Sequence, residues 1–176
     1  MLLDRLFRPR PARAVGQILY QRVVDQSRTS ALYADLGAPD TVEGRFEIYS
    51  LHVVLLLDRL RGHGEQAAET SQALFDTYVK ALDHALREMG VGDLSVGKKM
   101  RKLGEAFFGR AKAYETAFRA LPETQALEAL LGRTVYADAE PANAPRLVAY
   151  VLRQRTGLAE QELDRLLAGD VEWRPA

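Results

Sequence analysis

The sequence predicts an all-α fold, a single irregular helical domain of about seven helices. Apolar residues recur at steps of three and four along most of the 176 residues, the spacing that places them on one face of a helix. No clean alternation of apolar and polar residues, which would predict strands, is found. The apolar fraction of 47% is enough for one hydrophobic core. We therefore expect one helical domain at residues 12–176, preceded by a basic amphipathic segment at residues 1–11.

Glycines and prolines divide the first part of the chain into helices. One helix is expected at about residues 12–28, and a short turn or helix follows at residues 31–36. Asp40 is the expected N-cap of the next helix, because Glu43 stands three residues on, as in a capping box. The glycines at residues 62–64 are expected to end that helix.

Two long amphipathic helices are expected next, at about residues 65–89 and 93–121. Gly90 is suited to the C′ position after the first, where a positive φ is needed, and Gly92 provides a second permissive position. Asp93 or Ser95 is the expected cap of the second. The expected buried face of the first helix is Leu74, Phe75, Tyr78, Leu82, Ala85, Leu86 and Met89. That of the second is Met100, Leu103, Phe107, Ala111, Tyr114, Phe118 and Leu121.

Shorter helices are expected in the C-terminal part. They are placed at about residues 124–131, 145–154 and 159–167. The segment between the first two, residues 132–145, is the best loop candidate, because it contains two prolines and an asparagine. The single tryptophan, Trp173, is expected to hold the C-terminal tail against the domain.

Composition excludes several kinds of function. The absence of cysteine excludes disulfides, thiolate zinc sites, iron–sulfur clusters and a cysteine nucleophile. No apolar run approaches the ~18 residues that span a membrane. The 24 basic and 24 acidic residues cancel, so the net charge does not favour DNA binding. The Leu/Phe/Arg-rich segment 1–11 could make a weak contact with an anionic membrane surface, or could simply be a frayed basic terminus.

The stretch from residue 75 to residue 118 gives the strongest indication of a function. Its glycine turn, shaped by Gly90, Gly92 and Asp93, is followed by a dense group of cations and aromatic side chains. Phe107 and Phe108 are adjacent, so one stripe cannot bury both, and we expect Phe108 to be exposed as a partner anchor. Gly104 and Gly109 suggest close helix packing. The candidate partner-binding residues are Lys98, Lys99, Arg101, Lys102, Phe108, Arg110 and Tyr114.

Other chemistries have weaker support. Residues 92–99 match most of a Walker A pattern, but Lys99 stands where a hydroxyl should reach magnesium, and the segment follows a helix instead of a strand. His52, His63 and His84 do not form a spaced metal-ligand pair. No nucleophile elbow is present. We therefore expect neither catalytic residues nor a metal or cofactor.

Six segments of the sequence form a longer ordered pattern: LREMGVGDLSV at Leu86–Val96, KKM at Lys98–Met100, EAFFGR at Glu105–Arg110, AY at Ala113–Tyr114, FEIYSLH at Phe46–His52 and FD at Phe75–Asp76. Through these segments the chain resembles the ubiquinol–cytochrome c reductase assembly chaperone family. The resemblance is dense over residues 46–118. It implies an all-helical, non-enzymatic assembly factor of the cytochrome bc1 complex that binds newly made cytochrome b.

Several further expectations follow from the resemblance. The chain is expected to be a bacterial member, cytoplasmic or peripheral at the inner membrane. In mitochondria, family members act near the ribosome with a small partner protein, so a ribosome or a small helper protein is a further candidate partner. The alternative function is an RNA- or ribosome-binding module that uses the basic face at Lys98–Lys112. Phosphate contacts would make its affinity fall steeply with salt.

Overall fold

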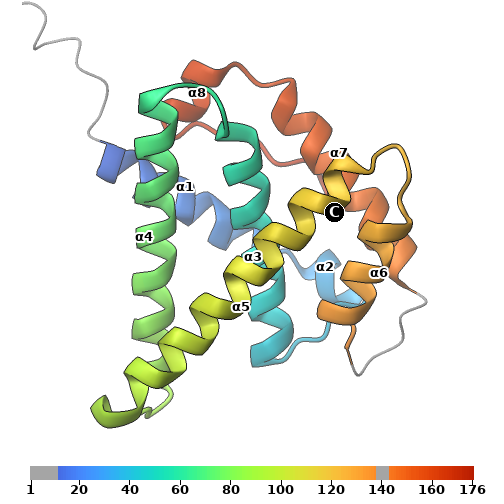
Figure 1. Cartoon of the computed structure of the whole chain (residues 1–176). Helices are drawn as coiled ribbons and strands as arrows, with labels where there is room; N and C mark the ends of the chain where they lie inside the picture. The colour runs from blue at the N-terminus through green and yellow to red at the C-terminus, as the bar shows by residue number, and fades with distance from the viewer. Residues whose placement is uncertain (1–11, 138–142) are drawn as a thin grey trace, which may run out of the picture.

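The computed structural model describes residues 12–137 and 143–176, which form eight α-helices and no strand. Their bounds are α1 Ala12–Ser27, α2 Ser30–Ala34, α3 Val42–Leu60, α4 Glu65–Glu88, α5 Asp93–Arg119, α6 Gln125–Thr134, α7 Ala144–Ala159 and α8 Leu163–Leu167 (Figure 1). The all-α prediction is confirmed, and the segment that was expected as a short turn or helix is the helix α2. The predicted N-terminal segment 1–11 lies outside the described residues, and so do residues 138–142 of the predicted loop.

Helix α3 lies at the centre of the fold. It packs against α1, α4, α5 and α7, and eleven of its nineteen residues are buried. The apolar residues between Leu51 and Leu56 point to several sides of α3 and are all buried. A helix that is apolar on most sides must be covered by other helices on most sides. The buried side chains of these helices form one continuous core.

Helices α1 and α4 make a close contact that depends on a glycine. Gly16 on α1 lies so near α4 that a Cβ atom at this position would approach the Ala73 carbonyl carbon to 2.5 Å. Such a distance is shorter than van der Waals contact, so any larger residue would push the helices apart. On the opposite side, α6 packs against both α5 and α7.

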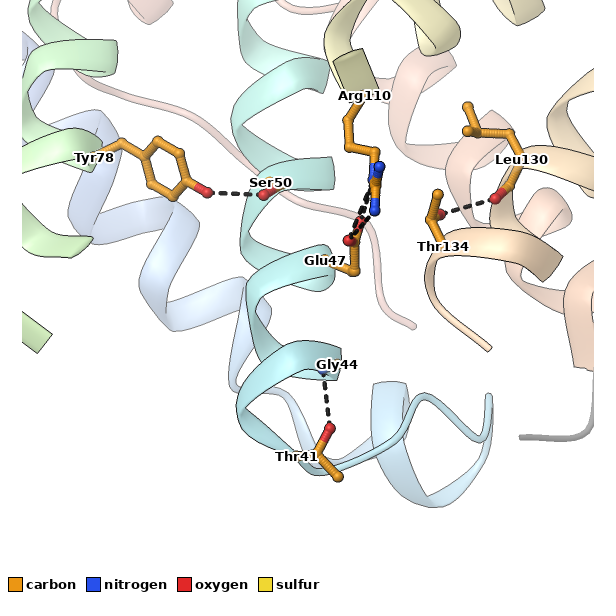
Figure 2. A network of polar contacts seen from close by, with 8 residues as sticks. All are labelled: Thr41, Gly44, Glu47, Ser50, Tyr78, Arg110, Leu130 and Thr134. Carbon is orange, nitrogen blue, oxygen red and sulfur yellow. Dashed lines mark hydrogen bonds and ion pairs between the residues drawn. The ribbon is translucent and has the colours of Figure 1, made fainter. Parts of the chain in front are cut away.

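Three polar side chains of α3 are buried, and each contacts a different neighbouring helix. The Glu47 carboxylate accepts hydrogen bonds from Arg110 on α5 at 2.8–3.2 Å. The Ser50 hydroxyl lies 2.8 Å from the Tyr78 hydroxyl on α4. Figure 2 shows these two contacts leaving α3 in different directions. His52 makes the third contact, with α7.

His52 is the hub of a fully buried polar network. Its Nδ1 lies 2.8 Å from the Ile48 carbonyl oxygen, which can only accept, so Nδ1 carries the proton. Nε2 then accepts from the Tyr150 hydroxyl at 2.7 Å. The Ser27 hydroxyl on α1 lies 3.1 Å from Nδ1. Burial disfavours the charged ring and lowers the pKa of His52 from 6.5 to about 4, although the Ile48 carbonyl opposes this shift.

Trp173 closes the network from the C-terminal tail. Its ring packs edge-on against the His52 ring, with 5.1 Å between the ring centroids. Its indole N–H donates to the Arg22 carbonyl oxygen on α1 at 3.2 Å. The tail is also held by Gln154, whose side chain exchanges two hydrogen bonds with the backbone of Arg174. The prediction that Trp173 holds the tail against the domain is confirmed.

The predicted helix ends need some corrections. Thr41, instead of Asp40, is the N-cap of α3, and its hydroxyl accepts from the Gly44 N–H at 3.1 Å (Figure 2). Asp40 instead forms an ion pair with Arg45. Met89, which was expected in the buried face of α4, is 53% exposed because it follows the last helical residue. Helices α6 and α7 both extend beyond their predicted C-terminal ends.

The free energy of unfolding is expected to decrease by roughly 2 kcal/mol between pH 7 and pH 4.5 because of His52. The unfolded chain binds a proton at this ring near pH 6.5, whereas the folded chain binds it only near pH 4. Lower pH therefore favours the unfolded state throughout this window. Urea denaturation at several pH values measures the effect. A His52→Gln variant that keeps the same pH dependence would contradict the assignment.

Candidate functional site

The turn between α4 and α5 has a well-defined geometry. Gly90 has a φ of +82°. Its N–H donates to the Arg87 carbonyl oxygen, and the Val91 N–H donates to that of Leu86. These are the two hydrogen bonds of a Schellman motif, which ends a helix at a left-handed glycine. Gly92 has an ordinary φ of −69° and is the N-cap of α5, so the predicted need for glycine holds for Gly90 alone.

Asp93 and Ser95 do not cap α5, in contrast to the prediction. Helix α5 begins at Asp93 itself, and no side-chain hydrogen bond caps it. The Asp93 carboxylate instead accepts from the Arg87 guanidinium, which links the two helices across the turn. Because residues from 93 onward are helical, the Walker-like segment 92–99 lacks the loop that wraps a phosphate.

The four cations that follow the turn are all exposed. They are Lys98, Lys99, Arg101 and Lys102, and we call them the basic cluster. Lys98, Arg101 and Lys102 share one side of α5, because residues three and four apart are neighbours on a helix. The nearest ion pair joins Arg101 to Glu105 at 3.7 Å, with both side chains largely exposed, so it contributes little stability. The charge of the cluster therefore faces solvent.

The two adjacent phenylalanines point in different directions, as predicted. Phe107 is 2% exposed, whereas Phe108 is 61% exposed. The Phe108 ring packs against the ring of Phe75 on α4, with 5.3 Å between the ring centroids. This exposed aromatic ring rests on a buried aromatic cluster, because Phe107 also contacts Phe75 and Tyr78.

Phe108 forms one wall of an apolar groove of about 560 Å³ between the end of α3, the start of α4 and the middle of α5. The main apolar residues that line it are Leu57, Ala68, Phe75, Phe107, Phe108 and Ala111. We call it the Phe108 groove. Arg61 also lines it and forms an ion pair with Glu115 at 2.7 Å. The groove could not be predicted from the sequence, since it is built from three helices whose packing no local pattern reveals.

Arg110 lies on the inner side of α5, away from the basic cluster. Two of its nitrogens donate to the Glu47 carboxylate of α3 (Figure 2). Hydrogen bonding to this carboxylate raises the pKa of Arg110. Glu47 is only 6% exposed, and a buried carboxylate needs such a partner. Arg110 therefore has a structural role in the core that the prediction of a partner contact did not include.

Tyr114 is also misplaced by the prediction, because its side chain is 1% exposed and cannot touch a partner. Its hydroxyl is buried without a hydrogen-bond partner. Burial raises its pKa, and the nearby Glu47 carboxylate raises it further. The ring packs against Phe118, with 5.9 Å between the centroids, so Tyr114 belongs to the core.

Gly104 and Gly109 do not mediate close helix packing, although their presence in α5 suggested it. A Cβ atom at either position would meet no atom of another element within 4 Å.

Among the described residues, no group of three or more His, Asp and Glu side chains could hold a metal ion. None of the helices formed by the described residues is both long enough and apolar enough to cross a membrane.

Comparison with known proteins gives consistent matches. The family model described as ubiquinol-cytochrome C chaperone matches residues 34–173. Ubiquinol-cytochrome c reductase complex assembly factor 1 of Mus musculus is 26% identical over 160 residues, which cover 89% of this chain and 54% of the mouse protein. The Xenopus laevis protein is 24% identical over 89% of this chain and 79% of its own length. The chain thus spans about half the length of the mouse relative.

A solved structure matches over nearly the whole length. The crystal structure of the Cbp3 homolog from Brucella abortus has a TM-score of 0.87 and 38% sequence identity. The match covers 99% of this chain and 97% of that chain.

Replacing Gly90 by serine is expected to destabilise the protein by about 1 kcal/mol, because a φ of +82° strains any residue with a Cβ atom. Gly92→Ser is the matched control, since serine is a good N-cap with ordinary φ, and it is expected to be neutral or slightly stabilising. Urea denaturation of both variants measures the difference. Equal effects would contradict the assigned turn geometry.

Arg110→Ala is expected to destabilise the protein by roughly 3 kcal/mol, because it leaves the Glu47 carboxylate buried without a partner. Arg101→Ala, on the exposed side of the same helix, is expected to change stability by less than about 0.5 kcal/mol. Thermal or urea unfolding of the two variants provides the comparison. If Arg110→Ala unfolds like the wild type, the structural role is wrong.

Proposed function

Because the chain belongs to the ubiquinol-cytochrome c chaperone family, as its motifs indicated, we propose that it is an assembly factor of the ubiquinol–cytochrome c reductase (cytochrome bc1) complex. The observation that carries the proposal is the family match over residues 34–173. The curated relatives are named as assembly factors of this complex. The fold supports a binding role, since it carries an apolar groove and, on the same helix α5, a group of exposed cations.

The proposed client is newly made cytochrome b, and the proposed contact is the Phe108 groove together with the basic cluster. A membrane subunit exposes apolar side chains until it is folded in the bilayer, and these need a temporary apolar cover. The groove of about 560 Å³ has room for a few side chains instead of a whole helix. Such a contact is weak and reversible, which suits a factor that must release its client.

Phe108 is the central contact in this proposal. Its ring is 61% exposed, so a client that covers it would gain about 1–2 kcal/mol from burial. Phe75 supports the ring from below, so little side-chain freedom is lost on binding. Lys98, Lys99, Arg101 and Lys102 extend the surface toward the α4–α5 turn, where they would attract acidic groups of the client. This role requires no catalysis.

Affinity purification of the tagged chain from mildly solubilised membranes of a native host tests the proposal. Cytochrome b is expected to co-purify at both low and high salt. Phe108→Ser is expected to reduce its recovery about tenfold at both salt concentrations, while Lys98→Glu with Lys102→Glu reduces recovery mainly at low salt. Lys80→Glu with Arg133→Glu, at two exposed sites away from the groove, is the charge-matched control.

The outcomes separate the candidate functions. Unchanged recovery of cytochrome b with Phe108→Ser and with the lysine variant would rule out the proposed contact surface. Ribosomal proteins or RNA that are lost at high salt, with no cytochrome b, would support the RNA- or ribosome-binding alternative. A small protein that co-purifies at both salt concentrations would identify a helper protein.

A further inference from the structure

The turn that joins α4 to α5 exposes apolar side chains that are not part of the hydrophobic core. The described residues include four exposed large hydrophobic side chains, and two of them, Met89 and Leu94, flank the same turn. Leu94 is fully exposed and Met89 is 53% exposed. The turn projects beyond the neighbouring helices at the lower left of Figure 1. We call residues 89–94 the hairpin tip.

The basic cluster lies just behind the hairpin tip. Lys98 and Arg101 follow Leu94 at four and seven residues, so they lie on the same side of α5. With a rise of 1.5 Å per residue, the four cations lie about 6–12 Å behind Leu94 along the helix. An apolar point with cations at this distance matches a bilayer surface, in which apolar side chains enter by about 5–10 Å and cations remain among the headgroups.

The charge around the tip is positive. Residues 84–102 contain five Arg and Lys side chains against Glu88 and Asp93. Both acids have nearby partners, because Glu88 lies 3.2 Å from His84 and Asp93 pairs with Arg87. The four cations of the basic cluster are exposed. This arrangement is complementary to anionic lipid headgroups, to which each nearby cation adds attraction.

The shape of the tip favours a membrane over a protein partner. Its apolar side chains stand on a projecting turn, so a protein would need a matching hollow to cover them, whereas a fluid bilayer adapts to any projecting point. The Schellman hydrogen bonds satisfy the N–H groups of Gly90 and Val91, which lowers the cost of bringing this part of the turn into a less polar surrounding.

We propose that the hairpin tip inserts into the surface of an anionic lipid bilayer, with Met89 and Leu94 among the upper acyl chains and the basic cluster among the headgroups. Phe108 lies fourteen residues beyond Leu94, about 21 Å further along α5. The Phe108 groove therefore stays outside the bilayer, close to its surface. The proposal does not depend on the identity of the client.

Sedimentation of the full chain with vesicles tests the proposal. Binding is expected with vesicles of one part phosphatidylglycerol to two parts phosphatidylcholine, and not with phosphatidylcholine alone. Met89→Ser with Leu94→Ser is expected to reduce partitioning at least tenfold. Lys98→Glu with Lys102→Glu is expected to reduce it by a similar factor. Val42→Ser, at another exposed apolar residue, and Phe108→Ser serve as controls and are expected to bind like the wild type.

A second readout reports insertion directly. Leu94→Trp places a fluorophore on a fully exposed position, so folding is expected to be unaffected, as circular dichroism can verify. The emission that it adds to that of Trp173 is expected to shift to the blue on anionic vesicles and to be quenched by brominated acyl chains.

Each contrary result overturns the proposal. No binding to anionic vesicles would exclude it. Binding that survives Met89→Ser with Leu94→Ser, or a Leu94→Trp spectrum that does not shift, would mean that the chain adsorbs by charge or through another segment. Met89→Ser with Leu94→Ser separates this proposal from the proposed function, because these residues are not part of the proposed client contact. Lost vesicle binding with normal recovery of cytochrome b would support the present proposal alone, and normal vesicle binding with lost recovery would overturn it.

Discussion

The fold depends on burying helix α3 on nearly all sides while its polar side chains still form hydrogen bonds. Helix α3 has no solvent face over most of its length, yet it carries Glu47, Ser50 and His52. Each of these buried groups has a partner on a different helix: α5, α4 and α7, respectively. Since an unpaired buried polar group would cost about 1–3 kcal/mol or more, these contacts fix which way each neighbouring helix faces.

The exposed surface of α5 is a consequence of this arrangement. Arg110 must reach Glu47, and Phe107 must pack on Phe75 and Tyr78. These contacts set the rotation of the helix about its axis, so Phe108 and the basic cluster must face outward. The same rotation brings Phe108 beside the end of α3 and the start of α4, where the groove forms. The surface proposed for binding and the hydrogen bonds of the core therefore share one cause.

Periodicity in the sequence was sufficient to predict the fold class, the two long helices and the opposite directions of Phe107 and Phe108. It could not distinguish an exposed cation from one that turns inward, since both suit the edge of an amphipathic helix, and the pairing of Arg110 with Glu47 was not predicted for this reason. Tyr114 already lay on the predicted buried stripe, so its role as a contact conflicted with its periodicity. The predicted N-cap of α3, Asp40, is one residue before the observed one, Thr41, because both residue types are good N-caps and the sequence does not choose between them. The groove and the exposed Leu94 depend on how helices distant in sequence pack together.

The His52 network has a consequence for the order in which the chain can complete its fold. His52 and Tyr150 are separated by 98 residues, and the tail residue Trp173 lies further still. During synthesis from the N-terminus, α1 and α3 emerge long before α7 and the tail. Until then the Nε2 atom of His52 lacks the Tyr150 hydroxyl that donates to it, and the ring lacks the cover of Trp173, so the buried polar network is incomplete. Folding of this domain is therefore expected to finish only after translation has passed residue 173.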